Sequence, residues 1–440
     1  MSLDLQKINN VHFIGIGGIG ISAIARMMKE EGKNVTGQDM QEGEIVSELK
    51  NLGIDIKIGQ SYENIPRDTD LIVYTIAIEY YDKDLYNKVK NGKMPSKSYP
   101  EMLGVISENK YTIAVCGTHG KTTTTGMISE ILIDAGKSPT VVVGSLLKNK
   151  TNFIKGDSDL FVVEACEYRR SFLNINPNVL VITNIDEDHL DYYKDIEDIK
   201  NAFHSMAMKV PSDGFIICNP KDKNISDVVK GAMGKVVDYA SYFDKDMKLM
   251  IPGVHNKKDA AAAVAAAATV GVSVEDSQKF LEKFPGTWKR FEYRGKLNNG
   301  SLLYDDYAHH PTEIMSTLEG FREIYPKEDN WKIFVIFQPH LFSRTKLLLA
   351  DFAKSFFETD MVFVLPIYFA REVDDGTISS DILVNEINKH SNNAESFKSF
   401  EMLEKYMADN LGKMNDKCII MTMGAGNASR IGDFLLDNFK

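Results

Sequence analysis

Short apolar runs alternate with longer amphipathic runs along most of the chain. Three of the short runs have the length and the β-branched or aromatic content of strands: VHFIGIG at 11–17, YTIAVCG at 111–117 and IFVIFQP at 333–339. Each is followed by a run with helical spacing, at 18–32, 121–136 and 344–357. Gly32 and Gly136 stand where the first two helices should end, as glycine caps do. The alternation predicts an α/β fold with parallel sheets and crossover helices.

Two polar, proline-bearing stretches divide this pattern into thirds. They are NGKMPSKSYPEM at 91–102 and FPGTWKRFEYRG at 284–295, and each precedes a new series of strands and helices. We therefore expect three domains, at 1–105, 106–291 and 292–440, each of ordinary domain size. The alanine-rich run Ala260 to Val270 predicts a packed helix, since it is too short to span a bilayer.

Composition narrows the class of protein. A formal charge of −11 and the absence of a long basic run argue against a protein that binds the nucleic-acid backbone. The four cysteines are widely spaced, without a CxxC pair, which is typical of a reducing compartment and not of a zinc knuckle or a disulfide framework. The N-terminal residues contain no apolar signal core. We expect a cytoplasmic protein without a membrane or nucleic-acid partner.

The first third opens with a glycine loop between a strand and a helix. Gly15, Gly17 and Gly20 have the spacing of a dinucleotide fingerprint, and Asp39 ends the next strand nineteen residues later. Such glycines let the backbone approach a diphosphate at a helix N-terminus. A nicotinamide cofactor, a flavin and a nucleotide-sugar diphosphate would all satisfy this pattern, and a structural turn is the alternative.

The second third opens with another glycine loop, VCGTHGKTTTTGM at 115–127. Only Thr118 and His119 separate Gly117 from the Gly120–Lys121 pair, so the match to the standard nucleotide loop is partial. Lys121 offers a cation to a terminal phosphate, and Thr122 offers a hydroxyl to Mg²⁺. Because a run of threonines is poor helix material, its presence at a helix start favours phosphate binding.

Two polar residues are expected at the same sheet edge as this loop. The strand LFVVEACE ends in Glu164, and we interpret VLVITNIDEDH as a strand that ends in His189. Together they could hold Mg²⁺ against transferring phosphates. A helix-capping carboxylate and a satisfied polar residue are the structural alternatives.

The last third contains two polar segments that follow strands directly. They are YDDYAHHPTE at 304–313 and FQPHLFSRTK at 337–346. Asp305 and Asp306 could bind ribose hydroxyls or a metal, and His309, His310, His340 and Arg344 could take a carboxylate. The histidines lack zinc-ligand spacing, and the chain has no GxSxG motif for a serine nucleophile.

Taken in order, these motifs closely resemble those of the Mur ligases of peptidoglycan synthesis, over essentially the whole chain. GTHGKTTTT matches the shortened nucleotide loop of that family, and HFIGIGGIGISAIA, DDYAHHPTE, FQPHLFSRT and the ARE at 370–372 resemble the members that use L-alanine. The resemblance implies a UDP-binding Rossmann-like domain, a central ATPase domain and a C-terminal Rossmann-like domain. It also implies ATP-dependent addition of L-alanine to UDP-N-acetylmuramate through an acyl phosphate. The alternative within the family is a recycling ligase that attaches a tripeptide to the same sugar nucleotide.

The resemblance also implies roles for individual residues. Lys121, His309 and Arg344 would be catalytic, and Tyr307, His309 and Arg344 would frame the amino acid. Thr122 and Glu164 would hold one Mg²⁺, and His189 a second. The UDP-sugar would contact Gly15, Gly17, Gly18, Ile19, Gly20, Asp39, Thr75 and Ala77. ATP would contact Gly117, Thr118, His119, Gly120, Lys121, Thr122, Thr123, Asn256, Arg290 and Asp305.

Some features depart from the family pattern. EACEYRRSFL at 164–173 replaces a more acidic, serine-containing stretch, and Asp259 stands where a second asparagine is expected near adenine. A nicotinamide oxidoreductase would leave the Lys121 loop unexplained. A non-catalytic nucleotide-binding regulator is a third hypothesis, suggested by Asp259. Whether the protein is a monomer or a homodimer is open.

Overall fold

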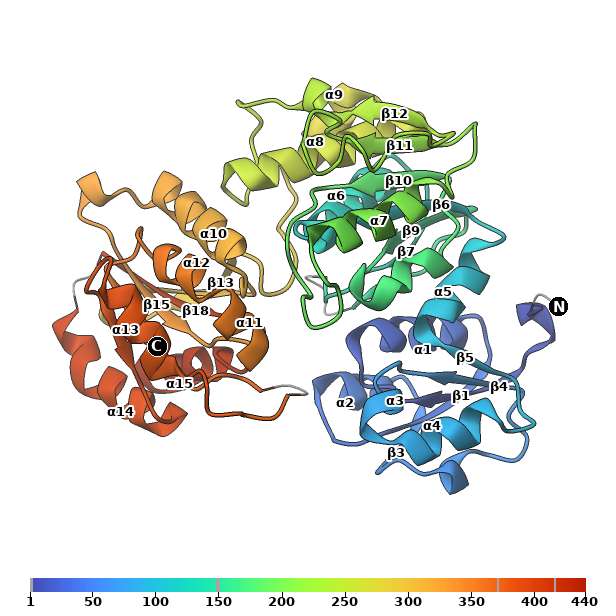
Figure 1. Cartoon of the computed structure of the whole chain (residues 1–440), viewed down its shortest axis with the longest axis horizontal. Coiled ribbons are helices and arrows are strands. Elements are labelled where there is room, and N and C mark those ends of the chain that lie inside the picture. The colour runs from blue at the N-terminus through green and yellow to red at the C-terminus, as the bar shows by residue number, and fades with distance from the viewer. Residues whose placement is uncertain (1–2, 148–150, 370–371, 415–416) are drawn as a thin grey trace. The chain divides into compact units, whose positions relative to one another are not determined.

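The computed structural model describes residues 3–147, 151–369, 372–414 and 417–440 (Figure 1). The chain forms two compact units. The first comprises Met1–Asp188, Tyr193–Asp244 and Lys258–Phe284, and the second His189–Tyr192, Lys245–Lys257 and Pro285–Lys440. The Ala370 and Arg371 of the ARE motif lie outside the described residues.

The first unit begins with a five-stranded parallel sheet in the order β3-β2-β1-β4-β5. Its strands are β1 Asn10–Ile14, β2 Asn34–Asp39, β3 Asp55–Ile58, β4 Leu71–Tyr74 and β5 Ser96–Ser98. Its helices are α1 Ile19–Glu30, α2 Glu44–Asn51, α3 Ile78–Tyr81 and α4 Lys83–Lys90.

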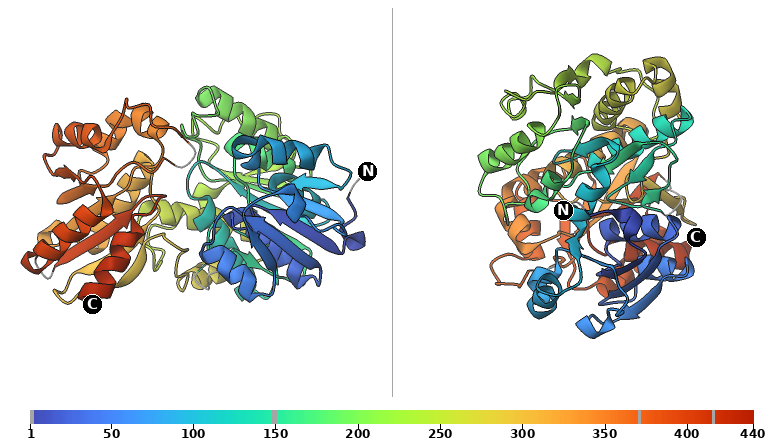
Figure 2. Two further views of the ribbon diagram at one scale, coloured as in Figure 1. Left: turned by 90° about the horizontal axis from the view of Figure 1, so that it is seen from below. Right: turned by 90° about the vertical axis from the view of Figure 1, so that its right-hand side faces the viewer.

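Side chains alternate between the two faces of this sheet. Phe13 packs on the face that α1 covers, whereas Ile14 packs with Ile78 and Leu85 from α3 and α4. Helices therefore lie on both sides of the strands, which are drawn in blue in Figures 1 and 2.

A second, seven-stranded sheet completes the first unit, in the order β12-β11-β10-β6-β9-β7-β8. Only β8 runs antiparallel to its neighbour. The strands are β6 Tyr111–Cys116, β7 Thr140–Val142, β8 Phe153–Ile154, β9 Leu160–Glu164, β10 Val179–Ile182, β11 Phe215–Cys218 and β12 Lys235–Asp238. The helices are α5 Tyr99–Ser107, α6 Lys121–Asp134, α7 Ile196–Ala207, α8 Val254–Thr269 and α9 Val274–Leu281. The first four residues of α8 group with the second unit.

The two sheets of the first unit share one hydrophobic cluster. Residues of α1 join it from the first sheet, and residues of α5 together with Phe172 and Phe203 join it from the second. Because burying this apolar surface stabilises both sheets at once, they form a single compact unit. Residues 260–267 of α8 are buried as well, which confirms the predicted packed helix.

The second unit is built on a six-stranded sheet in the order β13-β14-β18-β15-β16-β17, in which only β13 is antiparallel. The strands are β13 Glu292–Lys296, β14 Leu302–Asp306, β15 Lys332–Phe337, β16 Met361–Val364, β17 Ala394–Ser396 and β18 Cys418–Met423. The helices are α10 Pro311–Ile324, α11 Phe342–Leu347, α12 Leu349–Lys354, α13 Ser380–Asn388, α14 Phe400–Asn410 and α15 Ser429–Phe439. Side chains of α10, α12 and α13 pack on one face of the sheet, and those of α14 and α15 on the other.

The predicted α/β class with parallel sheets is confirmed. Three sheets carry the three series of strands, while the domain boundaries at 1–105, 106–291 and 292–440 stay predictions. In the part of the chain that the structure describes, every helix is too short or too polar to cross a membrane.

Candidate active site

The first glycine loop lies at the carboxyl edge of the first sheet. It joins β1 to α1, and Gly15 adopts a φ of +74°, which favours glycine. The amides of Gly15 and Ile16 both donate to the carbonyl of Gln38, at 2.9 and 3.2 Å. Gly18 caps α1 without a side-chain bond, so the first amides of the helix are directed toward the loop. This is the geometry that favours a diphosphate.

Neighbouring side chains explain why the loop needs glycine. A Cβ on Gly15 would lie 2.4 Å from Thr75, and one on Gly20 would lie 2.5 Å from the ring of Tyr99. A Cβ on Gly17 would lie 3.0 Å from a carboxylate oxygen of Asp39, which accepts the Gly17 amide at 2.8 Å. Asp39 and Thr75, predicted to contact the UDP-sugar, therefore both lie against the loop, and Ala77 follows two residues later as the N-cap of α3.

The second glycine loop joins β6 to α6 in the second sheet. Gly117 and Gly120 have φ values of +141° and +79°, and α6 begins at Lys121, where the predicted helical run begins. Asn184 supports the loop from the end of β10, because its side-chain oxygen accepts the His119 amide at 2.9 Å. The Thr183 hydroxyl donates to the carbonyl of His119 at 2.6 Å. Neither support was predicted, although a polar pair directly after an apolar strand was a signal for them.

Lys121 is turned back into its own loop. Its ammonium donates to the carbonyls of Gly117 and Thr118, at 2.6 and 2.9 Å, and lies 3.0 Å from the carboxylate of Glu167. Burial alone would lower the pKa of Lys121, but the adjacent Glu167 charge outweighs it and raises this pKa above its ordinary value. The cation that the loop was predicted to supply is therefore present and protonated at neutral pH.

Thr122 and Glu164 lie side by side, as the predicted metal pair requires. The Thr122 hydroxyl donates to the Glu164 carboxylate at 2.9 Å, and the Gly144 amide donates to the same carboxylate at 2.8 Å. Glu164 is the last residue of β9, as predicted. A hydroxyl and a carboxylate are hard oxygen ligands, so this pair fits Mg²⁺.

The prediction for His189 was partly wrong. β10 ends at Ile182, and His189 lies seven residues further on, with a φ of +54°. Beyond the strand, the side chains of Thr183 and Asn184 donate to the carbonyl of His119 in the phosphate loop. His189 groups with the second unit. Its role as ligand of a second ion stays a prediction.

In the second unit, the two histidine segments come together at the ends of β14 and β15. The His309 ring lies 5.3 Å from the Tyr307 ring and 5.9 Å from the His340 ring. Arg344, on α11, contacts the Nδ1 of His340 at 3.3 Å. The three residues predicted to frame the amino acid are therefore linked through His340.

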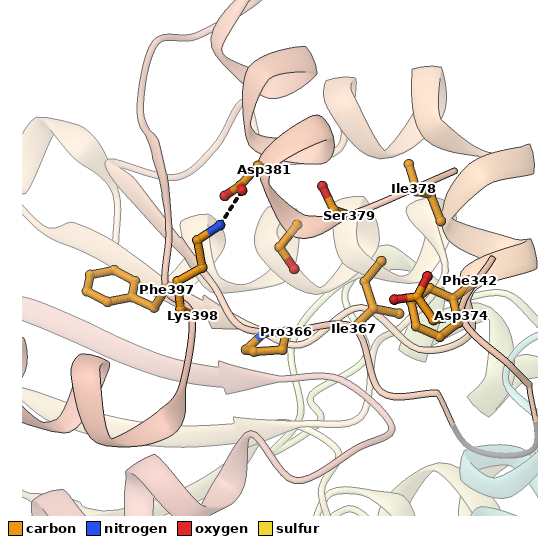
Figure 3. Close-up of a pocket in the computed structure, with 10 residues that line it drawn as sticks. Phe342, Pro366, Ile367, Asp374, Ile378, Ser379, Asp381, Phe397 and Lys398 are labelled. Carbon is orange, nitrogen blue, oxygen red and sulfur yellow. Dashed lines mark hydrogen bonds and ion pairs between the residues drawn. The ribbon is translucent and has the colours of Figure 1, made fainter. Parts of the chain in front are cut away.

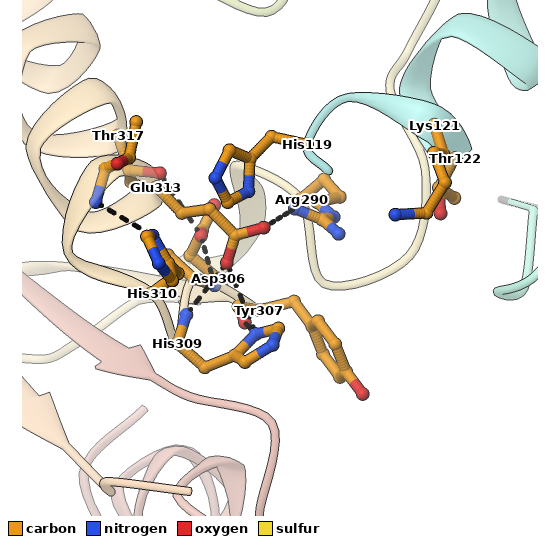
Figure 4. A network of polar contacts seen from close by, with 12 residues as sticks. His119, Lys121, Thr122, Arg290, Asp306, Tyr307, His309, His310, Glu313 and Thr317 are labelled. Carbon is orange, nitrogen blue, oxygen red and sulfur yellow. Dashed lines mark hydrogen bonds and ion pairs between the residues drawn. The ribbon is translucent and has the colours of Figure 1, made fainter. Parts of the chain in front are cut away.

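Contacts within the loop fix the ring of His309 (Figure 4). Its Nδ1 lies 2.9 Å from the carbonyl of Tyr307 and 3.3 Å from the carboxylate of Glu313. Glu313 also approaches Arg290 at 3.8 Å, and Arg290 lies over the Tyr307 ring. His310 has a different task, because its Nδ1 accepts the Thr312 amide at the start of α10.

Asp305 does not fit the predicted contact with ATP. Its side chain is 1% exposed and is held by Arg294 and Thr422 within the sheet. Burial raises the pKa of the Asp305 carboxyl, against the effect of these partners. Asp306 is likewise buried, and accepts the amides of Phe291 and Ala308. Both aspartates hold the β13–β14 region together, and we do not assign either to the nucleotide.

Two further features belong to the second unit. The Asn256 side chain, on the first turn of α8, donates to the carbonyl of Pro252 at 2.5 Å. A pocket of about 220 Å³ lies beyond β16 and β17, lined by Phe342, Ile367 and the ion pair of Asp381 with Lys398 (Figure 3). None of the predicted residues lines it.

Two glycine loops at helix starts, a lysine paired with a buried glutamate and an oxygen pair suited to Mg²⁺ are features typical of α/β enzymes that act on nucleotide phosphates. Three domain models of one family match the chain: "Mur ligase family, catalytic domain" at 10–111, "Mur ligase middle domain" at 115–248 and "Mur ligase, glutamate ligase domain" at 289–426. The chain belongs to the Mur ligase family.

Individual relatives are similar over their whole length. The UDP-N-acetylmuramate–L-alanine ligase of Caldanaerobacter subterraneus subsp. tengcongensis is 39% identical, with 100% of both chains covered. That of Agathobacter rectalis is 40% identical, with 99% of both covered. Among solved structures, the UDP-N-acetylmuramate-alanine ligase MurC of Thermotoga maritima has a TM-score of 0.77 at 27% identity, covering 97% of this chain and 98% of its own. A murein peptide ligase of Psychrobacter arcticus has a TM-score of 0.71 at 23% identity, with 98% of both covered, which shows the fold alone.

Proposed function

We propose that this chain joins L-alanine to the lactyl carboxylate of UDP-N-acetylmuramate, with ATP as the energy source, in peptidoglycan precursor synthesis. The observation that carries this function is the similarity at 39% and 40% identity, over the full length, to curated L-alanine ligases. The recycling ligase is not favoured, because the relatives that match at 39% and 40% identity over the full length are L-alanine ligases. We place the reaction in the cytoplasm, where ATP and UDP-sugars are made.

In the first step, a carboxylate oxygen attacks the γ-phosphorus of ATP. The bond from that phosphorus to the bridging oxygen breaks, ADP leaves with the electron pair, and an acyl phosphate remains. Because the charge on the transferring phosphoryl group must be neutralised, Lys121 is the residue we assign to it. Thr122 and Glu164 would hold Mg²⁺, which supplies further positive charge to the phosphates when bound.

In the second step, the amine of L-alanine attacks the acyl carbon, the bond to phosphate breaks, and inorganic phosphate leaves. The amine must first lose a proton, and His309 is the base that we assign. A proton on its Nδ1 is donated to the Tyr307 carbonyl, which leaves the lone pair on Nε2 to accept the substrate proton. Arg344 would pair with the alanine carboxylate.

For the UDP moiety, we assign the Gly15–Gly20 loop with Asp39, Thr75 and Ala77. Support comes from the close packing of Thr75 and Asp39 on the loop and from the start of α1, which has no side-chain cap bond. For ATP, we assign the loop from Gly117 to Thr123 together with Asn256 and Arg290. The support for these ATP contacts is the set of sequence motifs described above.

The test is phosphate release from ATP and Mg²⁺ with UDP-N-acetylmuramate and, in turn, L-alanine, glycine, L-serine or the murein tripeptide. We expect release that requires both the sugar nucleotide and L-alanine, and a product heavier by one alanyl residue. Release with the tripeptide alone would assign the protein to the recycling branch. Absence of release with every acceptor would favour a nucleotide-binding regulator.

A further inference from the structure

One carboxylate beside the phosphate loop has no place in the assignments above. Glu167 lies three residues beyond Glu164, and its side chain is 3% exposed. Its two oxygens lie 3.1 and 3.0 Å from the ammonium of Lys121, whose side chain is 14% exposed. A buried carboxylate needs a partner of opposite charge, and Lys121 provides one.

The backbone of Glu167 is fixed from several sides. Its carbonyl accepts the hydroxyl of the buried Tyr193 at 2.5 Å and the amide of Arg170 at 2.8 Å. Arg169 and Arg170 follow with φ values of +54° and +58°, an unusual conformation for residues other than glycine. Arg170 is anchored in turn to Asp198 at 2.6 Å. The carboxylate of Glu167 is therefore presented to Lys121 from a rigid position.

The three acceptors of Lys121 are not equivalent. Two are neutral carbonyls of its own loop, at Gly117 and Thr118, and one is the charged Glu167. Hydrogen bonds to neutral carbonyls are weaker than charge-assisted bonds, so phosphate oxygens can replace the carbonyls while the ion pair persists. Lys121 would then act on the phosphate while Glu167 holds its other side.

We propose that Glu167 is a positioning residue, which restrains the Lys121 ammonium at the point where it meets the transferring phosphoryl group. The proposal rests on the ligase function given above. A restrained cation stabilises the transition state without reorganisation, so the effect appears in kcat. The negative charge of Glu167 also weakens the attraction of the site for the triphosphate in the ground state, so its removal leaves the binding of ATP intact or makes it tighter.

The test compares Glu167→Gln with Glu167→Asp and with the exposed control Glu282→Gln. For Glu167→Gln we expect kcat to fall roughly 10- to 100-fold, while KM for ATP stays the same or falls. Glu167→Asp keeps the charge one methylene further away, so its kcat should lie between that of the wild type and that of Glu167→Gln. Glu282→Gln should behave like the wild type in both parameters.

Several outcomes would overturn the proposal. They are a Glu167→Gln kcat within twofold of wild type, a raised KM for ATP at unchanged kcat, or an Asp variant no better than the Gln variant. If Glu167→Gln fails to fold, a Glu167→Asp variant with the kcat of the wild type would overturn the proposal instead.

Calorimetric titration with Mg²⁺ and ADP, without any acceptor, separates this idea from the ligase function. The Gln variant should bind ADP at least as tightly as the wild type. Weaker ADP binding would contradict the positioning role. A wild-type protein that binds ADP but releases no phosphate with L-alanine would contradict the ligase assignment instead.

Discussion

The two glycine loops of the first unit have the same local architecture but different contents. Each joins a parallel strand to a helix and uses glycine at positive φ, at Gly15 in one loop and at Gly117 and Gly120 in the other. The side chains that pack against the first loop are neutral or acidic: Thr75 and Asp39. The second contains the ammonium of Lys121 and its counter-charge, Glu167.

This difference matches two different chemical tasks. A diphosphate that is only held needs backbone amides and close approach, which glycines supply. A phosphoryl group that is transferred develops charge that must be stabilised at a fixed point, which requires a restrained cation. We therefore expect changes in the first loop to alter the binding of UDP-N-acetylmuramate, and changes in the second to alter turnover.

The largest effect should follow from Lys121→Ala. Loss of the cation should lower kcat about 1000-fold, while the affinity for UDP-N-acetylmuramate, measured by calorimetry, should be unchanged. The substitution leaves Glu167 buried without its partner, so the free energy of unfolding should also fall by about 3 kcal/mol. The double variant Lys121→Ala, Glu167→Gln should regain stability but not activity. Ordinary turnover in the single variant would disprove the assigned role.

A second large effect concerns the pH dependence of stability, which should differ between the two sheets of the first unit. His12, on β1, is 1% exposed, and burial, with a smaller effect of Lys57, lowers its pKa from 6.5 to about 4. The unfolded state therefore binds the proton more readily, so stability is complete above about pH 6.5 and declines toward pH 4. The shift from 6.5 to about 4 corresponds to about 3 kcal/mol.

Hydrogen exchange should locate this loss of stability. Between pH 7 and pH 5, amide protection should fall in β1 to β5 more than in β6 to β12. His12→Gln removes the titrating group, so the difference between it and the wild type isolates this contribution. Equal pH dependence of β1 protection in both proteins would contradict the assignment to His12.

A smaller effect is expected from Gly17→Ala in the first loop. The added Cβ would lie 2.8 Å from Val46 and 3.0 Å from Asp39, so the loop must shift. KM for UDP-N-acetylmuramate should rise about tenfold, and KM for ATP should not change. Gly412→Ala, in the second unit, is the control, because its φ is not positive and no atom lies within 4 Å of its added Cβ. A parallel rise in the KM for ATP would show that the loops do not act separately.

Local signals in the sequence were sufficient for the framework of the fold. The apolar runs became β1, β6 and β15, and Gly32 and Gly136 end α1 and α6 with positive φ values. These predictions succeeded because strand length, helical spacing and glycine caps depend on neighbouring residues. The run at 344–357 was less simple, since it forms two short helices, α11 and α12, separated at Leu348.

Contacts between distant residues were beyond the reach of such signals. Asp305 looked like a ligand residue because it follows a strand, but its partners Arg294 and Thr422 come from other strands. Glu167 was passed over because its pairing with Lys121 joins segments 46 residues apart. His189 was placed on a strand because nothing local shows that Thr183 and Asn184 turn to the phosphate loop.

The smallest effect should come from the Thr122 hydroxyl, which has no counterpart in the first loop. Thr122→Val keeps the side-chain shape but removes the bond to Glu164 and one oxygen ligand, so the Mg²⁺ concentration for half-maximal activity should rise about fivefold. Thr122→Ser keeps the hydroxyl and should stay close to wild type. Because the first loop uses no metal in our assignment, the affinity of all three proteins for UDP-N-acetylmuramate should be independent of Mg²⁺. A marked Mg²⁺ dependence of that affinity would mean that the two loops share an ion, and the division between holding and transferring phosphate would then fail.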